Sequence, residues 1–536
     1  MVNTYDAIVI GGGHNGLVAA FYLARRGLRP VVLERRDIVG GCCVTEEFAP
    51  GYRASTGAYV LSMLRQAIWR DMRLVSRGVV VDAAGPTLNL YPDGAHLYLH
   101  DDIAPTSDEI SRFSKADARA FPDFEAHLAA IAEGVVPVFD WTPPDPRIRT
   151  LRDVGAMARF GALSFRHRGL LQDAAFLFTT SAAQFLGERF ESEHVKAAIG
   201  WHAINDSVAG PSTPGTAYVL LHDHASEEGG GGVRQWGFVR GGIGTVTERM
   251  ADAAREQGAE IRTGAEVARI LTRSGRAHGV ALADGEELYA PRVLSNADPK
   301  RTFLGLLEAN ELPEWFRRAV EAYRCMGTSI KINLAVSDLP YVRGLPDDGV
   351  QPYHTGIMEV TGLIPQMDMD QAKAQAGIPA VDSHVEVCFP TVHDPSLAPE
   401  GRHIVTIDVN SQPYGLADGQ GSWDEIRERR ADEVIEQLSA SFPDLPGKIL
   451  HRQVLSPLDL ERVLGISGGH ALHGDMSPDQ LLFMRPVRGY GDYRTPLRGL
   501  YMCGAGTHPG GGVTGANGRN AVREVLRDDK VARRAR

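Results

Sequence analysis

A glycine pattern near the start of the chain, Gly11-x-Gly13-x-x-Gly16, lies between an apolar run and a segment with helical periodicity. Gly11 permits a tight turn between strand and helix. Gly13 lets a pyrophosphate approach the backbone at the positive end of the helix, and Gly16 lets the helix lie close to the strand. The pattern therefore predicts a dinucleotide site, to which the helix-start residues His14 and Asn15 would also contribute.

The segments around this pattern fit a βαβ unit. We expect a strand over residues 5–10, a helix over residues 14–26 and a second strand over residues 30–34. Short continuous apolar runs of this kind are typical of parallel strands that are buried on both faces. Glu34 ends the second strand, where a carboxylate accepts hydrogen bonds from ribose hydroxyls, and Arg35 follows it.

A glycine pair, Gly40 and Gly41, comes six and seven residues after the acid. Together with the first glycine pattern and Glu34, this pair resembles the N-terminus of flavoproteins of the amine oxidase and phytoene desaturase group. In that group a glycine pair after the acid follows the pyrophosphate. The resemblance implies FAD as the cofactor, with Gly40, Gly41 and the adjacent Cys42 near the pyrophosphate.

A second glycine-rich segment lies near the C-terminus and resembles the phytoene desaturase pattern. A glycine-rich loop that opens a helix, expected over residues 513–527, presents backbone N–H groups and a positive dipole end to an electron-rich group. In the family this group is the flavin ring. The residues that the resemblance implies at the ring are Gly504, Gly506, Val513, Thr514 and Gly515.

The middle of the chain extends the resemblance. Residues 240–244, the helix that we expect after them and the segment 295–299 are similar to the part of the family's FAD domain that covers the adenosine, where Val267 would meet the adenine edge. Residues 485–496 resemble signatures of a subgroup, the pyridine nucleotide-disulfide oxidoreductase domain-containing protein 2 proteins.

The subgroup name promises a disulfide chemistry that this sequence does not support. A flavin disulfide reductase needs two cysteines about five residues apart, but Glu47 and Phe48 stand five residues after Cys42 and Cys43. We find no second strand–GxGxxG–helix unit for NAD(P)H. The sequence thus favours a flavoprotein that its organic substrate reduces.

Such a flavin takes a hydride from the substrate and is reoxidised by oxygen or a quinone. The reaction needs a C–H bond held near the ring in a dry pocket, without a nucleophile or a metal. The resemblance implies a hydrophobic small molecule, with long isoprenoids as the family example. The catalytic residues are not determined by the sequence, and the candidates for polar help are His508, inside the C-terminal glycine loop, and His473.

Several alternatives remain open. Desaturation, amine oxidation, reduction and isomerisation are all compatible with the motifs, and an amine oxidase would usually carry an aromatic cage at the flavin. From another class, FAD could be structural in a protein that binds a partner or a lipid.

We expect no metal site, because His202, His222 and His224 lack a third ligand at a convincing spacing. Residues 170–186 would line an apolar tunnel, touch a membrane or, as most such stretches do, pack in the core.

These segments predict an α/β fold in which a Rossmann-like FAD-binding domain is interleaved with a mixed α+β substrate domain. We place the FAD-binding domain at residues 1–75, 233–300 and 490–536, and the substrate domain at 76–232 and 301–489.

A net charge of -11 argues against nucleic acid as a partner. The absence of a signal peptide pattern or a long apolar run indicates a cytoplasmic protein, for which peripheral membrane contact is compatible with the sequence. The oligomeric state is not determined.

Overall fold

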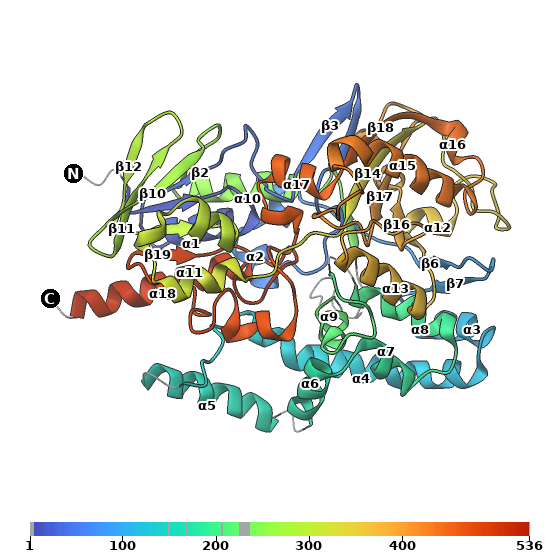
Figure 1. Cartoon of the computed structure of the whole chain (residues 1–536), viewed down its shortest axis with the longest axis horizontal. Helices are drawn as coiled ribbons and strands as arrows, with labels where there is room; N and C mark the ends of the chain where they lie inside the picture. Colours follow the sequence, from blue (N-terminus) through green and yellow to red (C-terminus); the bar gives the residue numbers. More distant parts are fainter. Residues whose placement is uncertain (1–4, 148–150, 167–168, 205–206, 224–235, 535–536) are drawn as a thin grey trace.

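The computed structural model describes residues 5–147, 151–166, 169–204, 207–223 and 236–534. Figure 1 shows two β-sheets side by side, with a layer of helices along one edge of the molecule. The first sheet, near both chain ends, is parallel. The second is mixed and lies at the opposite side. Within the described ranges, every helix is too short or too polar to cross a membrane.

The parallel sheet has five strands in the order β19-β13-β1-β2-β9. All its neighbouring strands run parallel. The first two strands confirm the predicted βαβ unit, with the helix α1 (His14–Ala24) between them. The strands are β1 (Ala7–Ile10), β2 (Pro30–Leu33), β9 (Glu260–Arg262), β13 (Val293–Ser295) and β19 (Leu500–Met502).

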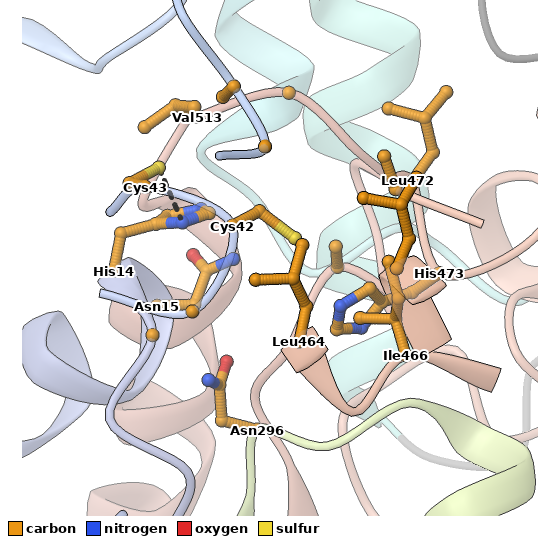
Figure 2. A pocket seen from close by; sticks show the side chains of 18 of the residues that line it. His14, Asn15, Cys42, Cys43, Asn296, Leu464, Ile466, Leu472, His473 and Val513 are labelled. Carbon is orange, nitrogen blue, oxygen red and sulfur yellow. Dashed lines mark hydrogen bonds between the residues drawn. The ribbon is translucent and has the colours of Figure 1, made fainter. Parts of the chain in front are cut away.

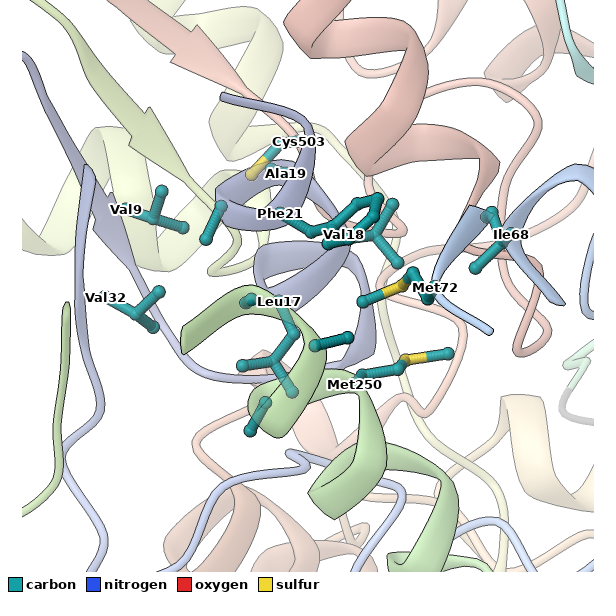
Figure 3. Close-up of a cluster of buried hydrophobic side chains, with 14 of the residues drawn as sticks. Val9, Leu17, Val18, Ala19, Phe21, Val32, Ile68, Met72, Met250 and Cys503 are labelled. Carbon is teal, nitrogen blue, oxygen red and sulfur yellow. The ribbon is translucent and has the colours of Figure 1, made fainter. Parts of the chain in front are cut away.

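Both faces of this sheet are buried, as the continuous apolar runs predict. On one face Val9 and Val32 pack with Leu17 of α1 (Figure 3). The helices α10 (Gly244–Glu256) and α18 (Ala516–Arg534) complete that layer. On the other face lies an antiparallel three-stranded sheet of β10 (Val267–Arg273), β11 (Arg276–Leu282) and β12 (Glu287–Tyr289).

The second sheet has seven strands in the order β18-β14-β17-β16-β15-β6-β7. Its neighbouring strands are antiparallel except for the parallel pair β15 and β6. The strands are β6 (Thr87–Leu90), β7 (His96–Leu99), β14 (Ile330–Val336), β15 (Ile357–Val360), β16 (Val385–Cys388), β17 (His403–Val409) and β18 (Ile449–Leu455).

The two faces of the seven-stranded sheet differ in polarity. Ile332 and Ile407, which are paired in register, point to the face that packs on the helix α15 (Trp423–Ser439). Their sequence neighbours Lys331 and Asp408 point to the other face, since successive side chains alternate along a strand. Lys331 is nevertheless buried, and both residues line a cavity between the two sheets. This face is therefore buried and polar.

The helical layer comes from the described residues between positions 71 and 223. The same region also supplies β6, β7 and the short strand β5 (Val81–Ala83), which pairs with β8 (Gly237–Val239). β6 and β7 alternate in polarity around Asp93-Gly94, so that the sequence does carry a local signal for this hairpin. The main helices are α3 (Ile103–Ser111), α4 (Lys115–Phe139), α5 (Leu151–Arg166), α6 (Leu170–Thr179), α7 (Ala182–Gly187), α8 (Glu193–Gly200) and α9 (Thr216–Asp223).

The C-terminal helix begins later than the sequence suggests. We expected it to start at Val513, but α18 starts at Ala516. Gly515 has a φ of 67°, which is the left-handed region and interrupts a helix. The Thr514 hydroxyl accepts a hydrogen bond of 3.2 Å from the Ala516 N–H, so that the loop ends at these residues. The predicted domain boundaries stay predictions, although the parallel sheet does draw its strands from three separate parts of the chain.

Candidate flavin site

A large cavity lies between the parallel sheet and the seven-stranded sheet. It holds about 2120 Å³ of space free of protein atoms, part of it open to solvent. Residues from the N-terminal, middle and C-terminal segments all line it (Figure 2). The cavity is thus assembled from the three segments in which we predicted cofactor contacts.

The N-terminal end of α1 opens into this cavity. The helix starts at His14 without a side-chain cap and without an acidic residue in its first turn. Its backbone N–H groups carry the positive end of the helix dipole, which favours an anion. A Cβ atom at Gly13 would lie only 2.8 Å from Nδ2 of Asn296, so that glycine keeps the backbone open to a ligand. These features fit the pyrophosphate of FAD.

Glu34 lies at the end of β2, in the cavity wall, and is almost fully buried. Its carboxylate accepts a hydrogen bond of 2.7 Å from the Gly12 N–H and one of 2.9 Å from the Arg36 N–H. A carboxylate has further lone pairs, so ribose hydroxyls can still donate to it. Arg35, beside it, donates hydrogen bonds to the backbone carbonyls of Arg462 and Val463. These bonds connect this end of the cavity to the helix that contains both residues, α17 (Pro457–Leu464).

Most residues that we predicted at the N-terminal and middle segments do line the cavity. Gly16 and Gly40 lie behind the lining: a Cβ atom at Gly16 would meet the Gly11 carbonyl oxygen at 2.2 Å, and Gly40 pairs with Gly13 in an isolated β-bridge. The contacts of these residues with FAD stay predictions. The predicted residues in the lining are Gly11, Gly13, His14, Asn15, Glu34, Arg35, Gly41, Cys42, Val267, His473 and Val513.

The C-terminal glycine loop contributes less of the lining than we expected. Val513 lines the cavity, and so do Ala505 and Gly512, which we had not singled out. Gly504 packs instead against the Asn296 backbone, and Gly506 packs against Pro299. Thr514 and Gly515 end the loop behind the cavity wall. The loop therefore uses several of its glycines for close packing against the turn after β13.

His508 does not line the cavity, although it belongs to the same loop. It is 1% exposed, and its Nε2 lies 2.9 Å from the carbonyl oxygen of Val138 in α4. Burial lowers the pKa of His508 to about 4, so that the ring is neutral at pH 7 and donates to that carbonyl. The placement of His508 fits an anchor between the loop and α4 rather than a group in reach of a ligand.

Two other histidines face the cavity from opposite sides (Figure 2). His14 lies at the start of α1, and His473 lies in the segment between α17 and β19. Burial is the main cause that lowers the pKa of each to about 4; His473 lowers the pKa of His14 further, and Arg485 lowers that of His473. Nδ1 of His14 lies 3.7 Å from the Cys43 thiol. Both rings are therefore neutral at pH 7 and can offer one donor and one acceptor to a ligand.

The wall opposite the glycine loops is charged, which the sequence analysis did not anticipate. Lys331 Nζ lies 3.2 Å from the centre of the Tyr59 ring and 3.9 Å from Oδ2 of Asp408. All three residues line the cavity. The available signal was a lysine within the strand β14, in which Asn333 is the other polar residue. Such a residue is buried at a cost that nearby charges and the aromatic face offset.

An apolar wall completes the cavity. It consists of side chains from the end of α17 (Pro457–Leu464) and from the segment that follows this helix. They include Leu464, Ile466 and Leu472 (Figure 2). We weighed residues 170–186 as a tunnel wall, but the described residues of this stretch do not line the cavity. They pack in the core of the helical layer, where the Phe178 and Tyr218 rings lie 4.3 Å apart.

Two of the three histidines that we weighed as metal ligands lie within the described residues. His202 and His222 both line the cavity, while His224 lies outside the described residues. Trp201 stacks on His202 with ring centres 3.8 Å apart, and Phe139 lies 5.2 Å from the ring of His222. Within the described ranges, no group of three His, Cys, Asp or Glu side chains is placed to hold a metal ion.

The fold and the cavity define a flavoprotein oxidoreductase. A family model for flavin-containing amine oxidoreductases matches residues 16–526, and the chain therefore belongs to that family. The protein binds FAD, as we predicted from the glycine motifs. FAD itself would supply the acceptor for two electrons from a substrate.

Comparison with individual proteins supports this assignment. The mouse pyridine nucleotide-disulfide oxidoreductase domain-containing protein 2 is 39% identical over 98% of this chain and 94% of its own length. A neurosporene-forming phytoene desaturase of Cereibacter sphaeroides is 26% identical over 98% of this chain and 94% of its own. A putrescine oxidase solved with putrescine bound has the same fold, with a TM-score of 0.62 at 16% identity over 98% of this chain and 99% of its own. The predicted family resemblance is confirmed.

Proposed function

We propose that this FAD-dependent oxidoreductase oxidises a hydrophobic small molecule by hydride transfer to the flavin, with oxygen or a quinone as the final electron acceptor. One observation carries the proposal. The cavity into which the start of α1 and Glu34 face also has an apolar wall that includes Leu464, Ile466 and Leu472. An apolar molecule bound there would lie beside the cofactor with water excluded. The similarity to a phytoene desaturase supports an isoprenoid-like substrate.

The side chains around the cavity have separate roles in this reaction. The apolar wall binds and orients the substrate, because each buried methylene contributes about 0.8 kcal/mol. His14 and His473 are neutral and offer hydrogen bonds without bringing a charge into the site. Lys331 adds a positive charge, which favours the negative charge that a two-electron reduction places in the cavity.

Oxidation of an amine is a second candidate, and the charged wall favours it. Asp408 presents a carboxylate to the cavity, which the ring of Tyr59 also lines. A carboxylate and an aromatic face are the groups that recognise an ammonium ion. The shared fold with a putrescine oxidase is compatible with this substrate class.

Anaerobic mixing tests the proposal. Purified holoprotein would be mixed without oxygen with a panel of isoprenoid hydrocarbons and a panel of alkylamines, while the absorbance of the oxidised flavin is followed. Bleaching by a hydrocarbon supports the first candidate, and bleaching by an amine supports the second. If dithionite bleaches the flavin and neither panel does, the protein is better described as one in which FAD is structural.

A pair of variants separates the cavity from the rest of the molecule. Leu472→Trp would fill the apolar wall and should slow flavin reduction by the substrate at least tenfold, while the FAD content is retained. Leu450→Trp is the matched control, because Leu450 is exposed on β18. Equal reduction rates in the two variants would contradict binding at this wall.

A further inference from the structure

A row of ionisable residues crosses the buried polar face of the seven-stranded sheet. Lys331 of β14 pairs in register with Asp408 of β17, which pairs with Glu386 of β16. Glu386 in turn pairs with Glu359 of β15. Residues directly opposite each other on neighbouring strands have Cβ atoms about 4.5–5.5 Å apart. Three carboxyl groups therefore follow one another across the sheet, starting at the cavity.

Glu386 occupies the centre of this row and is 4% exposed. Its Oε1 has no hydrogen-bond partner within the described part of the chain. Its cross-strand neighbours, Asp408 and Glu359, are both acids. Burial and the charge of Asp408 raise the pKa of Glu386 well above its ordinary value. Glu386 therefore retains a proton more readily than an ordinary glutamate does.

The titratable groups around Glu386 come from several elements. Beyond the two flanking acids, Lys331 lies one strand further on β14. His384 and Cys388 are two residues away along β16, on the same face, because side chains alternate along a strand. Nε2 of His384 lies 3.1 Å from Oε2 of Glu359, so that this acid has a partner of its own. Tyr59 and Trp236 cover Cys388.

Asp408 connects this centre to the cavity. Its side chain is 22% exposed and lines the cavity together with Lys331, whereas Glu386 lies one strand deeper. A proton can therefore pass between Glu386 and the cavity through the Asp408 carboxylate. Two carboxyl groups that face each other in a buried site share a proton readily, because both cannot be ionised together.

We propose that Glu386 is a proton store for the flavin reaction, coupled to the cavity through Asp408. Oxidation breaks two bonds to hydrogen in the substrate and forms one double bond. One hydrogen leaves as a hydride, whose two electrons would reduce the flavin, and the other leaves as a proton that the Asp408 carboxylate accepts and shares with Glu386. When dioxygen takes the two electrons to become hydrogen peroxide, it also needs two protons. One derives from the hydride, and the other returns from the row.

That the proton comes from the substrate rests on the proposed function, but the role of Glu386 as a proton store can be tested without a substrate. The holoprotein would be reduced anaerobically by light and a photoreductant, and its infrared difference spectrum recorded between the oxidised and reduced forms. We expect the carbonyl band of a protonated carboxyl group to change on reduction. Glu386→Gln should abolish this band, and Glu386→Asp should restore it. An identical difference spectrum in the wild type and Glu386→Gln would overturn the proposal.

Two further variants keep the experiment decisive. Glu436→Gln, on the exposed side of α15, is the matched control and should leave the spectrum unchanged. If Glu386→Gln fails to fold, Asp408→Asn tests the connection, because the band of Glu386 should then be missing from the difference spectrum. Reoxidation by dioxygen should also slow at least tenfold in Glu386→Gln at pH 8, and by less at pH 6, where the solvent supplies protons. A band that still responds in Asp408→Asn would exclude this route. Failure of these tests leaves the substrate assignment unaffected, since no substrate is used.

Discussion

The Glu34 carboxylate accepts a hydrogen bond of 2.7 Å from the backbone N–H of Gly12, within the loop that precedes α1. The acid that we predicted at the ribose thus also shapes the loop that would hold the pyrophosphate. A hydrogen bond to a charged group contributes about 1.5–3 kcal/mol. We expect Glu34→Gln to weaken FAD binding at least tenfold, since 1.4 kcal/mol corresponds to a factor of ten. Titration of the apoprotein with FAD, followed by flavin fluorescence, measures this. An unchanged affinity would show that the carboxylate charge is not needed.

Gly16 sets the distance between α1 and the loop before it. A Cβ atom there would lie 2.2 Å from the Gly11 carbonyl oxygen, and the backbone cannot move away without shifting the helix. We therefore expect Gly16→Ala to lower the free energy of unfolding by about 1–3 kcal/mol. Urea unfolding measures the change. Gly187→Ala, in α7, is the control, because the added methyl group would meet no atom within 4 Å. Equal losses in both variants would refute the packing argument.

His508 makes the stability of the protein depend on pH. Burial lowers its pKa from 6.5 to about 4, so that the unfolded chain binds a proton more readily than the folded one between these values. The stabilisation is present above pH 6.5 and is lost as the pH falls toward 4. Between pH 7 and pH 5 the wild type should lose about 2 kcal/mol more unfolding free energy than His508→Gln. Urea unfolding at both pH values checks this, with the exposed His451→Gln as the control. Parallel losses in wild type and His508→Gln would contradict the prediction.

The outward side of α5 is apolar, which is unusual for a surface helix. Val154 is 49% exposed and Phe165 is 69% exposed. Between positions 147 and 168 the sequence has six arginines and one aspartate, in a chain whose net charge is -11. A basic segment with an exposed apolar face suits an anionic lipid surface. We expect the protein to sediment with phosphatidylserine vesicles, and Phe165→Ser to reduce the bound fraction several-fold. Binding that is equal for neutral and anionic vesicles, or unaffected by Phe165→Ser, would contradict this role.

The N-terminal βαβ unit and the cofactor could be predicted because their signals are local. The turn at Gly11 and Gly13 and the acid Glu34 lie within one βαβ unit, where the spacing alone fixes the geometry. The charged wall could not be predicted in the same way. Lys331 and Asp408 are 77 positions apart in the sequence and meet only through the register of β14 and β17. A single sequence does not reveal such register.

The position of His508 could not be predicted for a related reason. The loop that contains it was recognised correctly, but a loop does not determine the direction of each side chain. Its partner is the Val138 carbonyl, 370 residues earlier at the end of α4. The contact depends on how the helical layer docks on the FAD-binding sheet, and the local sequence carries no record of that docking.

The order of strands in the parallel sheet also constrains when the protein can acquire its cofactor. β13 pairs on one side with β1, near the start of the chain, and on the other with β19 at Leu500–Met502. The loop and helix that follow β19 close the cradle around the start of α1. During synthesis the N-terminal βαβ unit therefore emerges long before the strands that flank it, and these long-range pairings form late. FAD loading consequently requires synthesis to have passed β19 and α18, and until then the N-terminal βαβ unit stays without its ligand.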